Sequence, residues 1–280
     1  MPRFSDWFQL SLSQPELDFV DIELDGDVPV YLDPFAISIY DNEWAHSCND
    51  LIIGFFQSAI NAIRRGDSAL AAGMLNHLTE PNETHLGVSS GRPQGRGVSG
   101  KQALDLYRAL ASSQAAKRGL LAELAECDLF VEGIGRDKVS DITTNIIRDL
   151  LITYTQQQCN LHDIPLTGTV ASGRIWDESQ GRWRERYVQL PTYRDTRVIL
   201  VPKHIVRRRL ALESYEYYNH HALVFLQAEH LAAHSSLVEV LKNGRRRVTK
   251  RRLKEEYPFS KDWLASFSED HPGVLDEYKK

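Results

Sequence analysis

The sequence of 280 residues carries 33 basic and 38 acidic side chains, a net charge of −5, and 42% of its residues are hydrophobic. This ordinary globular composition excludes collagen-like, coiled-coil and low-complexity proteins, and the lack of an 18-residue apolar stretch excludes a membrane-spanning helix. The first residues lack the basic region and the apolar region of a signal peptide, so we expect a cytoplasmic protein. The three cysteines form no CxxC pair, so we expect free, buried thiols.

The N-terminal part of the chain is strongly acidic. Residues 1–50 hold eleven Asp and Glu side chains and one basic residue, Arg3. Between residues 16 and 34, apolar and acidic positions alternate loosely around an Asp-Gly pair, which predicts a β-hairpin. We expect this acidic hairpin to dock on a basic surface of a partner or of the chain itself. A divalent cation is the alternative ligand, although the acids lack the order of a calcium loop.

Two helices and a glycine-rich loop are predicted next. Apolar residues recur at three- and four-residue spacing over 43–64, which indicates a helix, and a shorter helix over about 67–78 has Asp67 as its N-cap. Residues 80–101 are rich in glycine and are predicted to form a mobile surface loop.

The end of this loop has the GxxxxGK spacing of phosphate-binding loops, from Gly95 to Lys101. Gln102 stands where a magnesium-binding Ser or Thr is expected, and no suitable strand precedes the loop. We therefore predict phosphate contacts from Arg96 and Lys101 without nucleotide hydrolysis. A nucleotide or signal sensor that uses this loop is a minor alternative.

The middle of the chain reads as an α/β layer. Leucines and alanines recur helically from 101 to 126, and the apolar run 128–134 predicts a buried strand. Ser140 and Asp141 form a good N-cap pair for a helix that continues to Cys159.

The second half begins with a predicted hairpin whose turn is bracketed by Trp176 and Trp183. A strand over 197–202, a long helix over 210–241 with Asn243-Gly244 as its C-cap, and a last helix near 260–268 follow. The predicted fold class is α+β, with a central short mixed sheet packed by helices. We expect one domain over 1–280, which divides into the acidic hairpin (1–40), an α/β core (41–202) and a helical basic region (203–280).

The basic region contrasts with the acidic start. Residues 203–254 hold twelve basic and four acidic side chains, and the stretch 242–254, called here the basic segment, has eight basic side chains and no acid. Clustered Lys and Arg favour phosphate backbones because each contact releases condensed counterions. The alternatives are a solvated face or a patch neutralised by the acidic start. The predicted nucleic-acid-binding residues are Arg207, Arg208, Arg209, Arg245, Arg246, Arg247, Lys250, Arg251 and Arg252.

Carboxylates around the predicted strand 128–134 suggest a second kind of site. Val131-Glu132-Gly133 resembles the opening of a toprim-type metal site, but the Asp-x-Asp that such a site needs does not follow. A looser cluster of acids would suit a magnesium-dependent nuclease, since Mg²⁺ binds carboxylate oxygens while it bridges the scissile phosphate. The predicted catalytic residues are Glu132, Asp137, Lys138 and Asp141, with Glu132 and Asp141 as ligands of the cofactor Mg²⁺. The alternative role for Asp141 is that of a helix N-cap.

The stretches EPNETHLG, VEGIGRDKVSDITTNIIRDLLITYTQQQC and RVILVPKHIVRRR are similar to those of an uncharacterised family of bacterial proteins associated with mobile elements and anti-phage defence. The resemblance covers about residues 80–270 and implies a bacterial cytoplasm and an operon-encoded protein partner, without catalytic residues. Our first hypothesis is a nucleic-acid-engaging component of a defence system, in its enzymatic form a magnesium-dependent nuclease. The alternative is a non-enzymatic regulatory or assembly protein that binds a protein partner.

Overall fold

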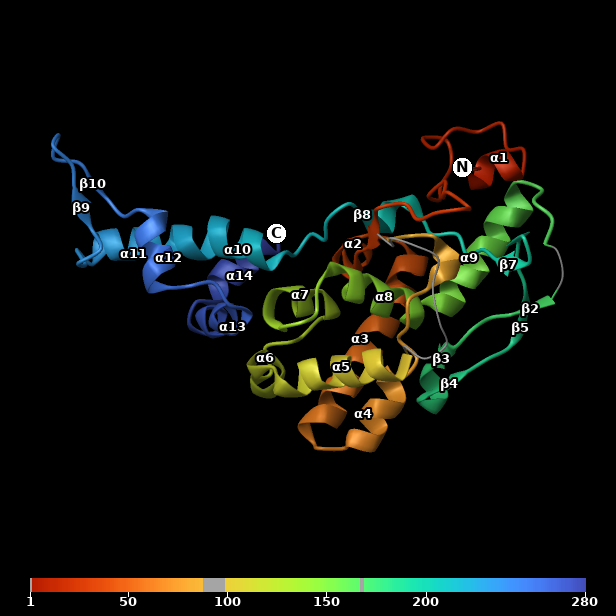
Figure 1. Cartoon of the computed structure of the whole chain (residues 1–280), viewed down its shortest axis with the longest axis horizontal. Helices are drawn as coiled ribbons and strands as arrows, with labels where there is room; N and C mark the ends of the chain where they lie inside the picture. Colours follow the sequence, from red (N-terminus) through yellow and green to blue (C-terminus); the bar gives the residue numbers. More distant parts are fainter. Residues whose placement is uncertain (1, 88–98, 167–168) are drawn as a thin grey trace.

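A computed structural model describes residues 2–87, 99–166 and 169–280. The molecule is elongated, with a larger body and a C-terminal arm of helices that projects from it (Figure 1). Helices dominate and strands pair two at a time, so the predicted α+β class is confirmed. Within the described ranges, no helix combines the length and the apolar character needed to cross a bilayer.

Two helices of the body begin at the residues that the sequence predicts, and a side chain caps each of them. In α3 (Glu43–Arg64) the side chain of Asn42 accepts a hydrogen bond from the Ala45 N–H at 2.7 Å. In α4 (Ser68–Leu75) Asp67 accepts from the Leu70 N–H at 3.0 Å. Both predictions are confirmed, because an N-cap that satisfies an otherwise unpaired N–H fixes where a helix begins.

The region after the glycine-rich loop is more broken than its helical pattern predicts. In place of one helix, α5 (Ser99–Ser112) ends before Ser113, which caps α6 (Gln114–Arg118), and Gly119 ends α6 at a φ of +88°. The predicted strand 128–134 is wrong, since α7 (Cys127–Phe130) and a turn occupy these residues. A short apolar run that is buried on every side has no period to separate strand from helix.

The next helix begins earlier than predicted. α8 (Arg136–Ile146) starts after Gly135, and α9 (Arg148–Leu161) continues from it. Ser140 therefore lies inside α8, where its hydroxyl accepts a hydrogen bond from the Leu32 N–H at 2.9 Å.

Strands form five separate antiparallel pairs in the described part of the chain, so the predicted central mixed sheet is wrong. The predicted hairpin is confirmed, with Trp176 opposite Trp183 and ring centroids 5.4 Å apart. The pairs are β1 (Tyr31–Leu32) with β8 (Val206–Arg207), β2 (Thr169–Ala171) with β5 (Tyr187–Gln189), β3 (Ile175–Asp177) with β4 (Arg182–Arg184), β6 (Thr192–Tyr193) with β7 (Thr196–Arg197), and β9 (Glu239–Val240) with β10 (Arg246–Arg247).

The acidic start of the chain does not fold back on itself as a hairpin. After α1 (Phe4–Trp7), its backbone pairs with residues far along the sequence, and Phe19 forms an isolated bridge with Pro202. Leu32 of β1 likewise pairs with Val206, just before α2 (Pro34–Ser38). The predicted hairpin is wrong because Phe19 and Ile22 are fully buried in one cluster with the distant residues Val198 and Leu200, and the backbone pairs with that segment instead of with itself across the Asp-Gly turn.

The predicted strand 197–202 is also wrong beyond Arg197, although residues 198–201 are fully buried. Their backbone bonds go to separate partners: the Ile199 N–H donates to the Glu83 carbonyl at 2.8 Å, and the Leu200 N–H donates to the Thr155 hydroxyl at 2.9 Å. An apolar run can thus lie extended in the core without joining a ladder.

The arm begins at residue 214. A single helical rod comprises α10 (Ser214–Tyr217), a π-helical turn η5 (Tyr218–Ala222) and α11 (Leu223–Ala232), and it ends earlier than the predicted helix 210–241. The strands β9 and β10 follow at its end, and three helices return toward the body (Figure 1). These are α12 (Lys250–Glu256), α13 (Lys261–Asp270), which confirms the last predicted helix, and α14 (Pro272–Tyr278).

Short 3-10 turns join these elements, and one hydrophobic core connects the body and the arm. Phe55 of α3, Phe130 of α7 and Tyr217 of α10 belong to the same buried cluster. A second cluster lies under the acidic start. The three cysteines are free and buried, as expected. The 3-10 turns are η1 (Asn82–Thr84), η2 (Leu124–Glu126), η3 (Glu178–Gln180) and η4 (Lys203–Ile205).

Candidate nucleic-acid interface

The basic segment forms the far end of the arm. Asn243-Gly244 makes the turn between β9 and β10, with Gly244 at a φ of +78°, and is therefore not the predicted helix C-cap. Val248 and Leu253 are buried and anchor the segment on the rod. Because these two apolar residues face inward, seven of the eight basic side chains are exposed and Lys250 is partly buried.

Several cations of the basic segment have partners that hold them in place. Glu239 accepts from Arg247 Nε and from Arg252 Nε, each at 3.2 Å. Arg246 lies 2.8 Å from the imidazole of His234. Other contacts are Arg251 with Glu255 at 3.1 Å and Lys250 Nζ with the Asn219 carbonyl at 2.7 Å.

The charge of the arm's end is only partly balanced locally. Residues 239–256 contain eight basic and three acidic side chains. Of the described residues, none forms an ion pair with Lys242 or Arg245, and both side chains are exposed. A cluster of exposed cations without matching acids produces a positive potential that attracts polyanions.

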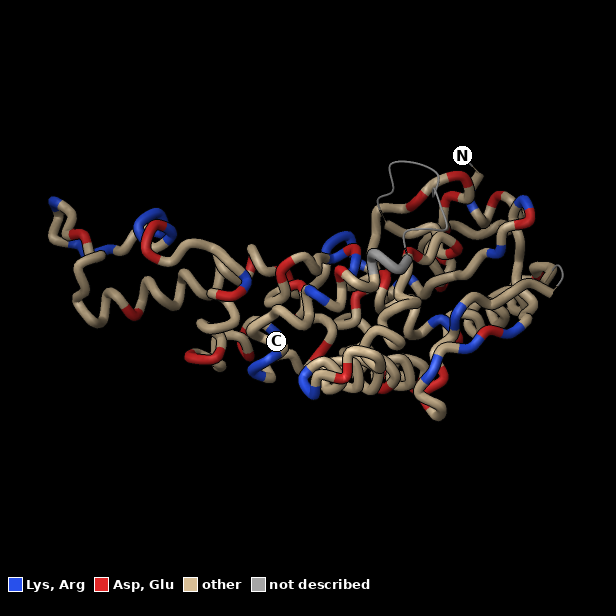
Figure 2. Tube along the Cα trace, turned by 60° about the horizontal axis from the view of Figure 1, so that its bottom comes forward, with Lys and Arg blue, Asp and Glu red and all other residues tan. Residues whose placement is uncertain are grey.

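The acidic start of the chain does not cover the basic segment. It lies at the other end of the molecule from β9 and β10, and the cations gather at the arm's end (Figures 1 and 2). Its acids bond elsewhere: Asp21 accepts from the Ser5 hydroxyl at 2.8 Å, and Asp25 pairs with Arg194 at 2.9 Å. The alternative of a patch neutralised by the acidic start is therefore wrong for the basic segment.

Arg207, Arg208 and Arg209 lie where the body meets the arm, and all three are exposed. The Arg207 guanidinium donates to the carbonyls of His204 and Val206, each at 2.9 Å. Arg209 lines a cleft of ≈ 510 Å³ between body and arm. The structure thus separates the predicted nucleic-acid-binding residues into a cluster at the junction and the basic segment at the end.

Two exposed aromatic side chains lie beside the basic segment. Tyr215 is 53% exposed and Phe259 is 39% exposed, with ring centroids 5.4 Å apart. The Lys254 ammonium lies 5.6 Å from the centroid of the Tyr215 ring. The sequence prediction missed this pair, although Tyr-Pro-Phe at 257–259 follows the basic segment closely and a tyrosine-rich stretch opens the rod.

The structure brings three of the four predicted catalytic residues together on α8, since Lys138 and Asp141 line one small pocket and the charge of Asp137 acts on Asp141, whereas Glu132 contacts the start of α13. Glu132 is exposed, and its carboxylate accepts from the Lys261 N–H at the start of α13 at 3.1 Å. Lys138 donates to the Gly133 carbonyl at 2.8 Å. Asp137 and Asp141 lie one turn apart on α8. Over the described ranges, no group of three or more His, Cys, Asp or Glu side chains is arranged to hold a metal ion.

Asp141 has the most unusual environment of these acids. It lines a small pocket together with Leu78, Leu106, Lys138 and Ile142. Burial raises the pKa of Asp141 to about 7, and the nearby charges of Glu80 and Asp137 raise it further. Asp141 lies inside α8, so it is not a helix N-cap. Because the pKa of its carboxyl group is about 7, a large fraction of the Asp141 carboxyl groups is protonated near neutral pH.

A buried ionic network, which the sequence prediction missed, lies deeper in the body. The Glu83 carboxylate contacts the Arg148 guanidinium, and Arg197 lies 3.7 Å from the same oxygen. Asn145 accepts from Arg148 at 2.9 Å and donates to the Thr79 carbonyl at 2.5 Å. The network ties η1 to α8, α9 and β7, which are distant in sequence, so no local pattern signals it.

The two predicted phosphate-binding residues cannot be placed in the same way. Arg96 lies outside the described residues. Lys101 lies in the first turn of α5, but its side chain is outside what the structure describes.

The fold and the candidate interface together define an α+β body with a cationic helical arm. Residues 9–213 match the family described as a domain of unknown function, DUF8370, and because this is most of the chain, the protein belongs to that family. The chain matches no curated protein and no solved structure. The family match ends directly before α10, so it includes Arg207, Arg208 and Arg209 but not the arm or the basic segment.

Proposed function

We propose that the protein binds nucleic acid through the basic segment at the end of its arm. The observation that carries the proposal is the set of exposed cations on β10 and α12, which the acidic start of the same chain does not neutralise. The planar forks of the guanidinium groups match the geometry of phosphate oxygens.

The elements that carry the cations also suit this role. The β9–β10 turn and α12 are separate elements held together by the Glu239 contacts with Arg247 and Arg252. A preordered cationic surface loses less conformational entropy on binding than a disordered tail does. The cations at the junction, Arg208 and Arg209, provide a second exposed cluster along the same molecule.

The proposal is tested by fluorescence anisotropy with a labelled oligonucleotide of about 20 nucleotides. The variant Lys242→Ala/Arg245→Ala removes two exposed cations without an acidic partner, so we expect affinity to fall about tenfold at low salt. The control Arg65→Ala/Arg182→Ala removes two exposed cations of the body and is expected to bind like the wild type. Equal affinity of both variants would contradict the proposal.

Magnesium-dependent cleavage stays a prediction within this proposal. Incubation of plasmid and RNA with and without Mg²⁺ tests it, with Asp141→Asn as the variant. Magnesium-dependent shortening of a substrate that the variant no longer cleaves would support catalysis. If the substrate stays intact under every condition, the catalytic part of the proposal is contradicted and the binding proposal stands. A role in bacterial defence likewise stays a prediction that rests on the resemblance alone.

The alternative of a protein that assembles with a partner has one supporting observation. Ile39 is 64% exposed and Tyr40 is 40% exposed, and the acids Asp41 and Glu43 follow them. An exposed apolar pair with an acidic border suits a partner with a basic rim around an apolar pocket. Co-purification with an operon-encoded neighbour that is lost in Ile39→Asp would favour this alternative, and unchanged co-purification would contradict it.

A further inference from the structure

We infer that the partner of the arm is a single-stranded nucleic acid whose bases stack on Tyr215 and Phe259. The inference rests on the proposed function and deepens it, because it names the form of nucleic acid. It starts from two large aromatic side chains that remain exposed beside a cationic surface: 53% for Tyr215 and 39% for Phe259.

Buried aromatic side chains hold the two exposed rings in place. Behind them the ring of Tyr218 lies 5.3 Å from Phe259 and 5.6 Å from Trp263, in edge-to-face contacts. Tyr218 is buried, and its hydroxyl donates to the Tyr257 carbonyl at 2.5 Å. Tyr215 and Phe259 are thus the exposed border of an ordered aromatic cluster, and a base that stacks there meets surfaces already fixed in place.

The cations lead from the end of the arm to this aromatic pair. Lys250, at the start of α12, contacts Asn219 in the π-helical turn, and Lys254, one turn later, lies over Tyr215. α12 therefore runs back along the rod from the β9–β10 turn toward the exposed rings. A strand that follows this line has its phosphates beside cations and its bases beside the rings.

A nucleic acid with unpaired bases is the ligand that can use both the cations of α12 and the exposed aromatic rings. In a duplex the base faces are stacked on one another and are not available to a protein side chain, whereas single strands expose them. Proteins that bind single strands combine a cationic track with aromatic side chains, and each stacked base adds affinity without sequence preference. The Lys254 side chain is exposed and is free to move from the Tyr215 ring to a phosphate as a base takes its place.

The test compares a labelled single strand without self-complementarity with its matched duplex, each of about 20 nucleotides. We expect the wild type to bind the single strand more tightly. The variant Tyr215→Ala/Phe259→Ala is expected to lower single-strand affinity roughly 5- to 100-fold, with little change in duplex affinity or in the salt dependence. Tyr215→Trp retains a stacking face and is expected to bind like the wild type, which separates stacking from a folding defect.

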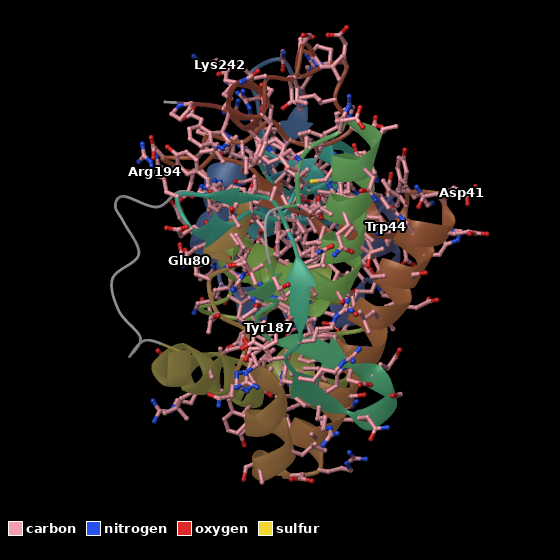
Figure 3. The ribbon with its side chains drawn as sticks, turned by 90° about the vertical axis from the view of Figure 1, so that its right-hand side faces the viewer. Asp41, Trp44, Glu80, Tyr187, Arg194 and Lys242 are labelled. Atoms are coloured by element: carbon pink, nitrogen blue, oxygen red, sulfur yellow. The ribbon has the colours of Figure 1, made fainter. Side chains whose placement is uncertain are left out.

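Tyr187→Ala is the matched control, since Tyr187 is 78% exposed and β5 lies at the end of the molecule away from the arm (Figures 1 and 3). Duplex binding as tight as single-strand binding, with Tyr215→Ala/Phe259→Ala equal to Tyr187→Ala, would overturn the inference while the proposed function stands. Lack of wild-type binding to either probe would instead overturn the proposed function, and the inference with it.

Discussion

Glu83 balances two buried or half-buried guanidinium groups in the body, those of Arg148 and Arg197. It is 8% exposed and Arg148 is 5% exposed, so neither charge is solvated by water. Burial lowers the pKa of Arg148 to about 10, with a further decrease from the charge of Arg197. Both groups are still charged at neutral pH, which makes the single carboxylate essential to the network.

Replacement of this carboxylate tests the network directly. We expect Glu83→Gln to lower the free energy of unfolding by roughly 3–5 kcal/mol, because it leaves buried positive charge without a partner. The measurement is chemical denaturation at pH 7. Glu178→Gln, which makes the same change at an exposed position, serves as the control. Equal stability of the two variants would show that the network contributes little.

Asp141 makes a pH-dependent contribution to stability. Its pKa of about 7 in the folded protein exceeds the usual value of about 3.9 for an unfolded chain. Between these values the folded state retains a proton that the unfolded state releases, so this group lowers the stability as the pH rises.

Asp141→Asn removes the titrating group, since an amide does not ionise. We expect the variant to match the wild type below about pH 4 and to gain on the order of 1–3 kcal/mol at pH 8, where the wild type buries a charge beside Glu80 and Asp137. Denaturation at several pH values measures the difference. A constant difference from pH 4 to pH 8 would mean that Asp141 titrates normally.

At the scale of elements, Glu239 restrains the basic segment. It pairs with Arg247 of β10 and with Arg252 of α12, so it joins the two elements and also occupies two cations. We expect Glu239→Gln to bind nucleic acid about threefold or more tightly, because it releases both guanidinium groups and adds one unit of net positive charge.

Anisotropy titration at one fixed salt concentration checks this prediction, and thermal melting shows whether the variant keeps its fold. Glu178→Gln again provides the same charge change in the body, away from the arm, and is expected to leave affinity unchanged. Weaker binding of a folded Glu239→Gln would mean that order in the segment matters more than free charge.

Elements with local signals were predictable from the sequence. The helix cap Asp67, the helical spacing over 43–64 and the paired Trp176 and Trp183 each act within a few residues, and these helices and the hairpin are confirmed. The segments 128–134 and 198–201 were not predictable in this way. They are buried on every side, and their backbone partners lie far away in the sequence, so neither period nor turn identifies their structure.

Some residues of the candidate site were also predictable from the sequence, and others depend on contacts between distant segments. The exposed cations of the basic segment follow from composition, because Lys and Arg remain at the surface in almost any fold. The aromatic pair Tyr215 and Phe259 depends on how the rod meets the segment after α12, and the Glu83 network depends on contacts between distant segments. The different surroundings of Glu132, which contacts α13, and of Asp141, which shares a pocket with Lys138, likewise became visible only in three dimensions.

At the scale of the whole molecule, the net charge of −5 conceals two separated ends. The acidic start packs on the body near Arg194 and Val201, while the basic segment lies at the end of the arm, outside the family domain (Figure 2). This separation leaves the positive end available to a polyanion even though the molecule as a whole is negative.

The salt dependence of binding tests this account most directly. The affinity for a labelled single strand is measured from about 50 to about 300 mM salt for the wild type and for Lys242→Ala/Arg245→Ala. We predict a steep linear loss of log affinity with log salt, and a slope that is smaller by about 1.4 in the variant, since each lost phosphate contact removes about 0.7. A flat dependence, or equal slopes for the two proteins, would contradict the claim that the basic segment binds nucleic acid.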